Sequence, residues 1–199
     1  NDLRNILKEN IEPTFNSITV DGDTSTNDTV MIFSVGDKKV QKIDKKLKKK
    51  ISEKIFQIML NLSKQIVSDG EGISKLIEVN VINAKNDNQA KNIGFSVANS
   101  LLVKTAVSGE DANWGRVVMA IGKKQENIKQ EKIIIKFGNL IVAKNGMVYK
   151  KINISSLNKY MKNKIIKINI NLNMGKYKKT VWSSDLTHKY IEINSDYRS

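Results

Sequence analysis

One stretch of the sequence concentrates small polar side chains between two apolar runs: ITVDGDTSTNDTV, from Ile18 to Val30. It holds three acids, one asparagine and several hydroxyl groups. Oxygen ligands of this kind can bind a cation, and a carboxylate after a strand can accept a phosphoryl group. The same side chains can also satisfy the backbone groups of a bend. The chemistry of this stretch therefore has three interpretations.

A calcium loop is the first interpretation, because oxygen ligands alternate along the chain from Asp21 to Asn27. An EF-hand loop that starts at Asp21 also needs a glycine at its sixth position and a glutamate at its twelfth. Those positions hold Thr26 and Ile32. The pattern therefore argues against an EF-hand.

A phosphohydrolase is the second interpretation. The apolar residues before VDGDT, with Asp21 and Asp23 in an Asp-x-Asp-x-Thr pattern, resemble the nucleophile motif of the magnesium-dependent haloacid-dehalogenase-like phosphatases. That family also needs a downstream acidic pair to hold magnesium, and no Asp-Asp or Gly-Asp-x-x-x-Asp cluster follows here. The phosphatase stays as the alternative enzyme, and a hydrogen-bonded bend is the third interpretation.

The elements around this stretch follow from hydrophobic periodicity. Helical spacing predicts helices over residues 2–11, with Asp2 as a cap, over the lysine-rich tract from residue 37 to about 68, and over residues 87–100 and 113–122. Apolar runs or alternation predict strands over residues 15–20, 30–36, 75–85, 103–109, several within 133–149, 165–175, and one near the C-terminus before a short terminal element. Asn145-Gly146 predicts a hairpin turn.

This mixture of strands and helices predicts an α+β or layered α/β fold. We expect one domain over residues 1–199, with a smaller C-terminal lobe from about residue 123 as the alternative organisation. The chain has no cysteine, which excludes disulfides and thiolate metal sites, and we expect it to reside in the cytoplasm.

The net charge of +14 raises the hypothesis of a nucleic-acid-binding module. Arginine, which nucleic-acid readers favour for its planar fork, occurs only at Arg4, Arg116 and Arg198. Aromatic residues, which stack on bases, make up only 6% of the chain. We therefore interpret the lysines as a solvated surface and expect neither a nucleic-acid nor a membrane partner.

Four long blocks together resemble the ornithine acetyltransferase family, the glutamate N-acetyltransferases of arginine biosynthesis. The blocks are TFNSITVDGDTSTNDTV, SDGEGISKLIEV, ANSLLVKTAVSGEDANWGRVVMAIG and DLTHKYIEINSDYRS, in the order of the family. One departure is Ala112, where the family usually has proline. The resemblance implies a sandwich of sheets and helices with a self-cleaving threonine nucleophile.

The resemblance further implies a precursor that cuts itself before that threonine, leaving α and β chains that assemble as a heterotetramer. This sequence resembles a β chain without its first segment, so we expect the nucleophile upstream of residue 1 and no catalytic residue within the chain. By the resemblance, the threonine carries an acetyl group from N-acetylornithine to glutamate. We expect no metal or cofactor, although acetyl-CoA can be a further acetyl substrate, and we expect this chain alone to be inactive.

Site residues also follow from the resemblance. Glu71, Asn194 and Ser199 match substrate-contacting positions, and Asn27 and Asp28 match residues that support the site. A carboxylate suits the cationic amine of ornithine, and an amide or hydroxyl suits its polar groups. His188, the only histidine, is expected on the surface, and Trp114 and Trp182 are expected to pack in the interior.

Overall fold

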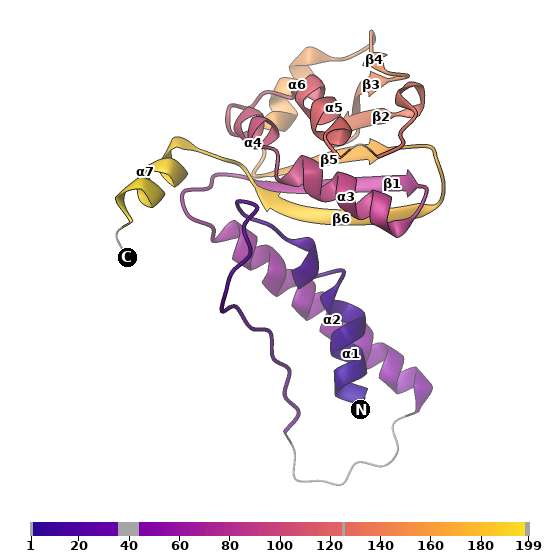
Figure 1. The fold of residues 1–199 in the computed structure, drawn as a ribbon, viewed down its shortest axis with the longest axis vertical. Helices are drawn as coiled ribbons and strands as arrows, with labels where there is room; N and C mark the ends of the chain where they lie inside the picture. The colour runs from indigo at the N-terminus through magenta and orange to yellow at the C-terminus, as the bar shows by residue number, and fades with distance from the viewer. Residues whose placement is uncertain (1, 36–43, 125, 198–199) are drawn as a thin grey trace.

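A computed structural model describes residues 2–35, 44–124 and 126–197. Its main body is a mixed six-stranded sheet with helices packed against it (Figure 1). The strands are β1 (Leu76–Ala84), β2 (Ile134–Phe137), β3 (Leu140–Lys144), β4 (Met147–Val148), β5 (Ile165–Asn171) and β6 (Tyr177–Ser184). Their order across the sheet is β4-β3-β2-β5-β1-β6, and only β1 and β5 pair in parallel.

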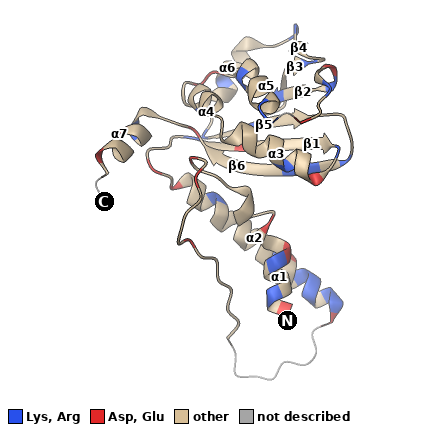
Figure 2. Ribbon diagram, viewed as in Figure 1, with Lys and Arg blue, Asp and Glu red and all other residues tan. Residues whose placement is uncertain are grey.

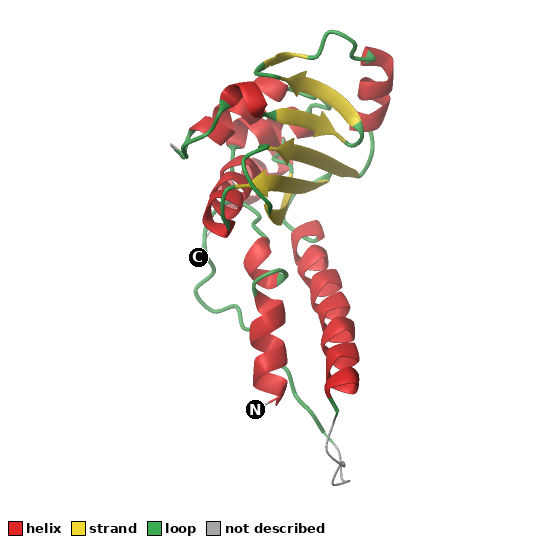
Figure 3. Ribbon diagram, turned by 90° about the vertical axis from the view of Figure 1, so that its right-hand side faces the viewer, coloured by secondary structure: helices red, strands yellow, loops and turns green. Residues whose placement is uncertain are grey.

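The sheet buries one face almost completely. Val79 on β1 pairs with Ile168 on β5 and Val181 on β6, and all three are inaccessible to solvent. The helices α3 (Asp87–Ala98), α4 (Leu101–Ser108) and α5 (Trp114–Gly122) lie over this part of the fold (Figures 1 and 3). Because the side chains of a strand alternate, the other face carries polar residues such as Asn80 and Asn169, which bond to each other at 3.0 Å.

Two helices extend away from the sheet side by side. They are α1 (Asp2–Ile11) and α2 (Lys45–Ser68), joined by Lys48 to Asp2 at 2.6 Å and by Asn10 to Ser52 at 3.1 Å. The lysines gather along the first turns of α2 (Figure 2). Asp44 caps this helix by accepting the N–H of Leu47. The remaining elements are two 3₁₀ turns, η1 (Phe15–Ser17) and η2 (Gln130–Lys132), and the helices α6 (Ile154–Met161) and α7 (His188–Asp196).

Most of the predicted elements are confirmed, and the α+β layered class is correct. The predicted strands at residues 75–85 and 165–175 form β1 and β5, and the Asn145-Gly146 turn joins β3 to β4. Helix α3 is capped by Asn86, whose side chain accepts the N–H of Gln89. Strands from both sides of residue 123 share one sheet, and the one-domain organisation stays a prediction. Among the described residues, no helix combines the length and apolar character that a transmembrane span requires.

Three strand predictions are wrong. Residues 103–108 belong to helix α4 and Gly109 is its C-cap, because Ser100 caps the start of the helix and Val103, Ala106 and Val107 bury one helical face. Residues 15–20 form η1 followed by a single bridge between Ile18 and Trp182.

Residues 30–35 are the third wrong strand prediction. They are extended but find no strand partner among the described residues, and Gly36 lies outside the described part. Met31, Phe33 and Val35 are 67%, 78% and 95% exposed. An apolar run predicts a strand only if a neighbouring strand accepts its hydrogen bonds, and here none does.

Glu12 connects α1 to the sheet. Its carboxylate accepts hydrogen bonds from Lys91 on α3 at 2.8 Å and Lys179 on β6 at 3.2 Å. Burial raises the pKa of Glu12, but hydrogen bonds from Lys91, Asn16 and Lys179 outweigh it and lower the pKa to about 2. Since this pKa is depressed in the folded state, the contribution to stability is complete above pH 4.5 and is lost as the pH falls towards about 2.

We therefore expect Glu12→Gln to lower the melting temperature at neutral pH and to flatten its decline between pH 4.5 and about 2. Thermal melting across that range measures both effects. Glu53→Gln is the matched control, because Glu53 is exposed and forms a single long ion pair among the described residues, with Lys49 at 4.0 Å. Equal pH curves for wild type and Glu12→Gln would contradict this prediction.

Candidate active site

Glu71 and Asn194 meet although 123 residues separate them in sequence. Glu71 lies in the turn between α2 and β1, and Asn194 lies on α7. The Asn194 Nδ2 group donates to Glu71 Oε2 at 3.0 Å and to the carbonyl of Tyr190 at 3.0 Å. Both side chains remain exposed, so a ligand can reach them. The structure thus joins two of the three predicted substrate-binding residues.

These hydrogen bonds determine which atoms of Glu71 and Asn194 remain available to a ligand. Both Nδ2 hydrogens of Asn194 point at acceptors, and the opposite amide orientation would set oxygen against oxygen. Among the described residues, the Asn194 Oδ1 atom and the Glu71 Oε1 atom therefore remain without a hydrogen-bond partner. Two acceptors, one of them anionic, suit a cationic N–H donor such as an alkylammonium group.

A close approach of backbone brings α7 onto the turn. Gly72 has a φ of +63°, and a Cβ added to it would lie 2.4 Å from the backbone nitrogen of Tyr190. Thr187 caps α7 by accepting the N–H of Tyr190 at 3.3 Å, and its hydroxyl donates to the Gly72 carbonyl. Only glycine fits both the left-handed conformation and this contact.

Asp185 fixes the chain that leads into α7. Its buried carboxylate accepts the N–H of Ser74 at 2.8 Å, the hydroxyl of Ser74 at 2.5 Å and the N–H of Lys75 at 3.0 Å. These bonds join the end of β6 to the segment between Glu71 and β1. The bonds to Asp185 therefore hold the end of β6, which leads to Asn194, next to the start of β1, which follows the Glu71 turn.

Asp21 connects the polar stretch of residues 18–30 to the same helix. The hydroxyl of Tyr190 donates to Asp21 Oδ2 at 3.1 Å, and the N–H of Asp23 donates to Asp21 Oδ1 at 3.0 Å. Partial burial, followed by the charge of Asp21, raises the pKa of the Tyr190 hydroxyl, which stays protonated as a donor. The first residues of this stretch therefore form a hydrogen-bonded bend, the third interpretation of the sequence.

Asn27 and Asp28 are not joined to the Glu71–Asn194 pair in the described structure. Both are exposed, and the hydrogen bonds recorded for Asn27 come from Ser25 at 3.2 Å and Thr29 at 3.3 Å. The prediction that they support the site stays a prediction. Ser199 lies outside the described residues.

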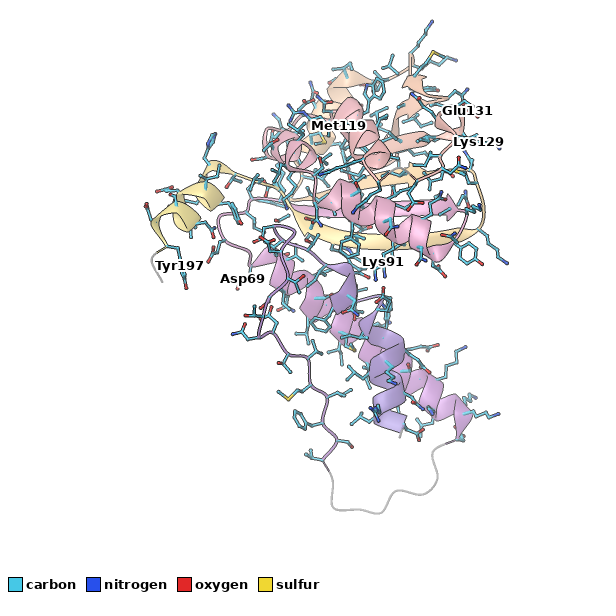
Figure 4. All side chains as sticks on the ribbon, viewed as in Figure 1. Asp69, Lys91, Met119, Lys129, Glu131 and Tyr197 are labelled. Atoms are coloured by element: carbon cyan, nitrogen blue, oxygen red, sulfur yellow. The ribbon has the colours of Figure 1, made fainter. Side chains whose placement is uncertain are left out.

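The other singled-out residues lie as expected. His188 is exposed at the start of α7. Trp182 is buried, with Lys64 Nζ 5.0 Å from the centre of its ring, and Trp114 packs against the core. Figure 4 shows Asp69 and Tyr197, which flank the site in sequence, on the side of the molecule opposite Glu131.

The phosphatase alternative finds no support. Its motif requires a strand of the central sheet before Asp21, and the chain there makes only the Ile18–Trp182 bridge. Across residues 2–35, 44–124 and 126–197, no group of three acidic or histidine side chains gathers that could hold a metal ion. Asp21 instead accepts hydrogen bonds from Tyr190 and Asp23.

Comparison with known proteins decides the family. The ArgJ family model matches residues 1–199, the whole of the sequence. The chain belongs to the ArgJ family. The family membership predicted from the four blocks is thereby confirmed.

The curated ArgJ relatives align with almost the whole of this chain. The arginine biosynthesis bifunctional protein ArgJ of Caulobacter vibrioides is 40% identical over 99% of this chain and 50% of its own length. That of Bartonella henselae is 46% identical, over 99% and 49%. The chain therefore spans about half the length of these curated relatives. The crystal structure of argJ from Bacillus halodurans superposes with a TM-score of 0.90 at 36% identity, covering 98% of this chain and 93% of that one.

Proposed function

We propose that this chain is the β-chain part of a glutamate N-acetyltransferase that moves an acetyl group from N-acetylornithine to glutamate. The observation that carries the proposal is the Glu71–Asn194 pair, two acceptors on one exposed surface of an ArgJ-family fold. Ornithine carries an alkylammonium group that these acceptors suit. The names of the relatives place those proteins in arginine biosynthesis, where this chemistry belongs.

The proposed reaction uses a threonine upstream of residue 1, as the family resemblance implies. Its hydroxyl attacks the acetyl carbonyl while its free α-amino group takes up the hydroxyl proton. The C–N bond to ornithine breaks, and the leaving amine takes the proton back. The amine of glutamate then attacks the acetyl-threonine ester, forms N-acetylglutamate and restores the hydroxyl. Glu71 and Asn194 hold the ornithine ammonium so that the acetyl group faces the nucleophile.

We propose an α chain from the same precursor as the partner. The chain spans about half of its relatives, and its exposed apolar residues lie where a partner could cover them. Met31, Phe33 and Val35 form an extended run without a strand neighbour among the described residues, and Ile58 and Leu62 on α2 are also exposed. An exposed apolar extended segment and an apolar helix face of this kind suit a protein interface.

The rest of the proposal follows the family resemblance. We propose assembly as two α and two β chains and residence in the cytoplasm. The reaction needs no metal or cofactor, because the nucleophile carries its own base, and acetyl-CoA enters only as an alternative acetyl substrate.

The deciding experiment restores the upstream half of the gene and measures ornithine release from N-acetylornithine plus glutamate. We expect release by the assembled protein and none by the 199-residue chain alone, because the nucleophile lies upstream. If glutamate is left out so that the acetyl-enzyme accumulates, mass spectrometry should find an acetyl group on the first residue of the β chain. Transfer by the isolated chain, or an assembled protein that releases no ornithine, would overturn the proposal.

A further inference from the structure

Lys104 is a lysine in the interior of the protein. It lies on α4, it is 2% exposed, and it is among the largest fully buried side chains. Lysine is seldom buried to this degree, because removing an ammonium group from water is costly unless acceptors replace the water. Its Nζ atom lies 2.5 Å from the Val20 carbonyl, 2.6 Å from the Ser184 carbonyl and 3.1 Å from the Ser183 hydroxyl. A fourth oxygen, the Ser184 hydroxyl, lies at 3.3 Å.

The three nearest partners all accept hydrogen bonds. Two are carbonyls, and the Ser183 hydroxyl donates its own proton to the Ala98 carbonyl at 3.1 Å. An ammonium group has three N–H donors, and a neutral amine has only two. The two carbonyls and the Ser183 hydroxyl together match the three donors of the charged form. Burial lowers the pKa of Lys104 to about 8, although the carboxylates of Asp185 and Asp21 act in the opposite direction.

Each acceptor belongs to a segment that builds the Glu71–Asn194 site. Val20 precedes Asp21, which accepts the hydroxyl of Tyr190 on α7. Ser184 precedes Asp185, which holds Ser74 next to the Glu71 turn. Lys104 thus bonds to the residues directly before the two carboxylates that fix α7.

We propose that Lys104 is a positioning residue, which holds the segment at Val20 to the end of β6 at Ser184 so that α7 places Asn194 next to Glu71. The inference rests on the proposed function of that pair. Lys104 itself touches neither Glu71 nor Asn194 in the described structure. Its removal should therefore weaken the binding of the substrate and leave the chemistry of acetyl transfer largely intact.

The test uses the assembled enzyme with Lys104→Met, which keeps the length of the side chain and removes the charge. We expect the KM for N-acetylornithine to rise about tenfold while kcat changes less than about threefold, because three hydrogen bonds to a charged group are lost. Lys179→Met is the matched control, since Lys179 also donates to a carbonyl and a carboxylate, both of Glu12, on the opposite part of β6. It should lower stability without moving the KM.

A double-mutant cycle separates positioning from general stability. If Lys104 acts through Glu71, adding Lys104→Met to Glu71→Gln should raise the KM little further, because the charge of Glu71 that the positioning serves is already gone. Multiplicative effects, or an unchanged KM with a lowered melting temperature, would overturn the proposal. If Lys104→Met does not assemble, Ser183→Ala removes one of the three acceptors and should raise the KM about threefold, again without adding to Glu71→Gln.

Amide hydrogen exchange gives a readout that does not depend on the reaction. Lys104→Met should speed exchange in residues 188–196, and Lys179→Met should not. Unchanged exchange there would overturn the inference even if the wild type were an active acetyltransferase. A wild type that releases no ornithine, with faster exchange in Lys104→Met, would instead overturn the proposed function and keep Lys104 as the residue that fixes α7.

Discussion

Replacing Glu71 by glutamine in the assembled enzyme should lower kcat/KM for N-acetylornithine about 100-fold. Glutamine keeps the shape of the side chain and can still accept the hydrogen bond from Asn194, so the fold and the position of α7 are preserved. What is lost is the negative charge that, in the proposed function, faces the ornithine ammonium. Hydrogen bonds to charged groups are worth about 1.5–3 kcal/mol, and each 1.4 kcal/mol is about tenfold in rate or affinity.

Ornithine release at several substrate concentrations measures this effect. Glu131→Gln is the control, because Glu131 is an exposed acid on η2 at the far side of the molecule (Figure 4), and its kinetics should match those of the wild type. A Glu71→Gln enzyme within about twofold of the wild type would remove Glu71 from the substrate site.

Replacing Gly72 by alanine should damage both stability and activity. A left-handed residue with a Cβ costs about 1–2 kcal/mol, and this Cβ would also lie 2.4 Å from the Tyr190 nitrogen. The clash is with backbone, so α7 itself must move, and Asn194 moves away from Glu71 with it. We expect a loss of about 2–3 kcal/mol in the free energy of unfolding and of more than about tenfold in kcat/KM.

Thermal melting and the same kinetic assay test both parts of this expectation. Gly122→Ala is the matched control, since an added Cβ at the end of α5 meets no heavy atom within 4 Å and should leave stability the same or slightly higher. Full activity in Gly72→Ala would show that the close approach of α7 to the turn is not needed for the site.

The parts of the fold that could be predicted are those whose own periodicity is strong. The alternation from Ile165 to Asn171 and the spacing of apolar residues in α2 each determine an element without help from the rest of the chain. Helix α4 was wrongly predicted as a strand because Val103 and Val107 favour strands locally. The buried position of the helix and its Ser100 cap outweigh that preference.

The candidate site also contains residues that could be predicted from the sequence and residues that could not. Glu71 and Asn194 could be predicted because they lie in blocks that resemble a family, and the structure brings them together. Asp185, Tyr190 and Lys104 lie in the same blocks, but the resemblance assigned them no role, and their roles depend on partners more than 75 residues away in sequence. Hydrophobic periodicity indicates the local secondary structure of a segment and carries no information on contacts between residues so far apart in sequence.

The exposed apolar run at residues 30–35 also bears on how the protein is synthesised and folds. It contains six residues without charge or proline, VMIFSV, with backbone groups open to pairing. Such a segment is prone to cross-β aggregation when several copies meet. A partner synthesised on the same polypeptide reaches it at an effective concentration on the order of millimolar, long before another copy does. Cleavage after folding, as in the proposed precursor, would then leave two chains in which the partner already covers this aggregation-prone segment.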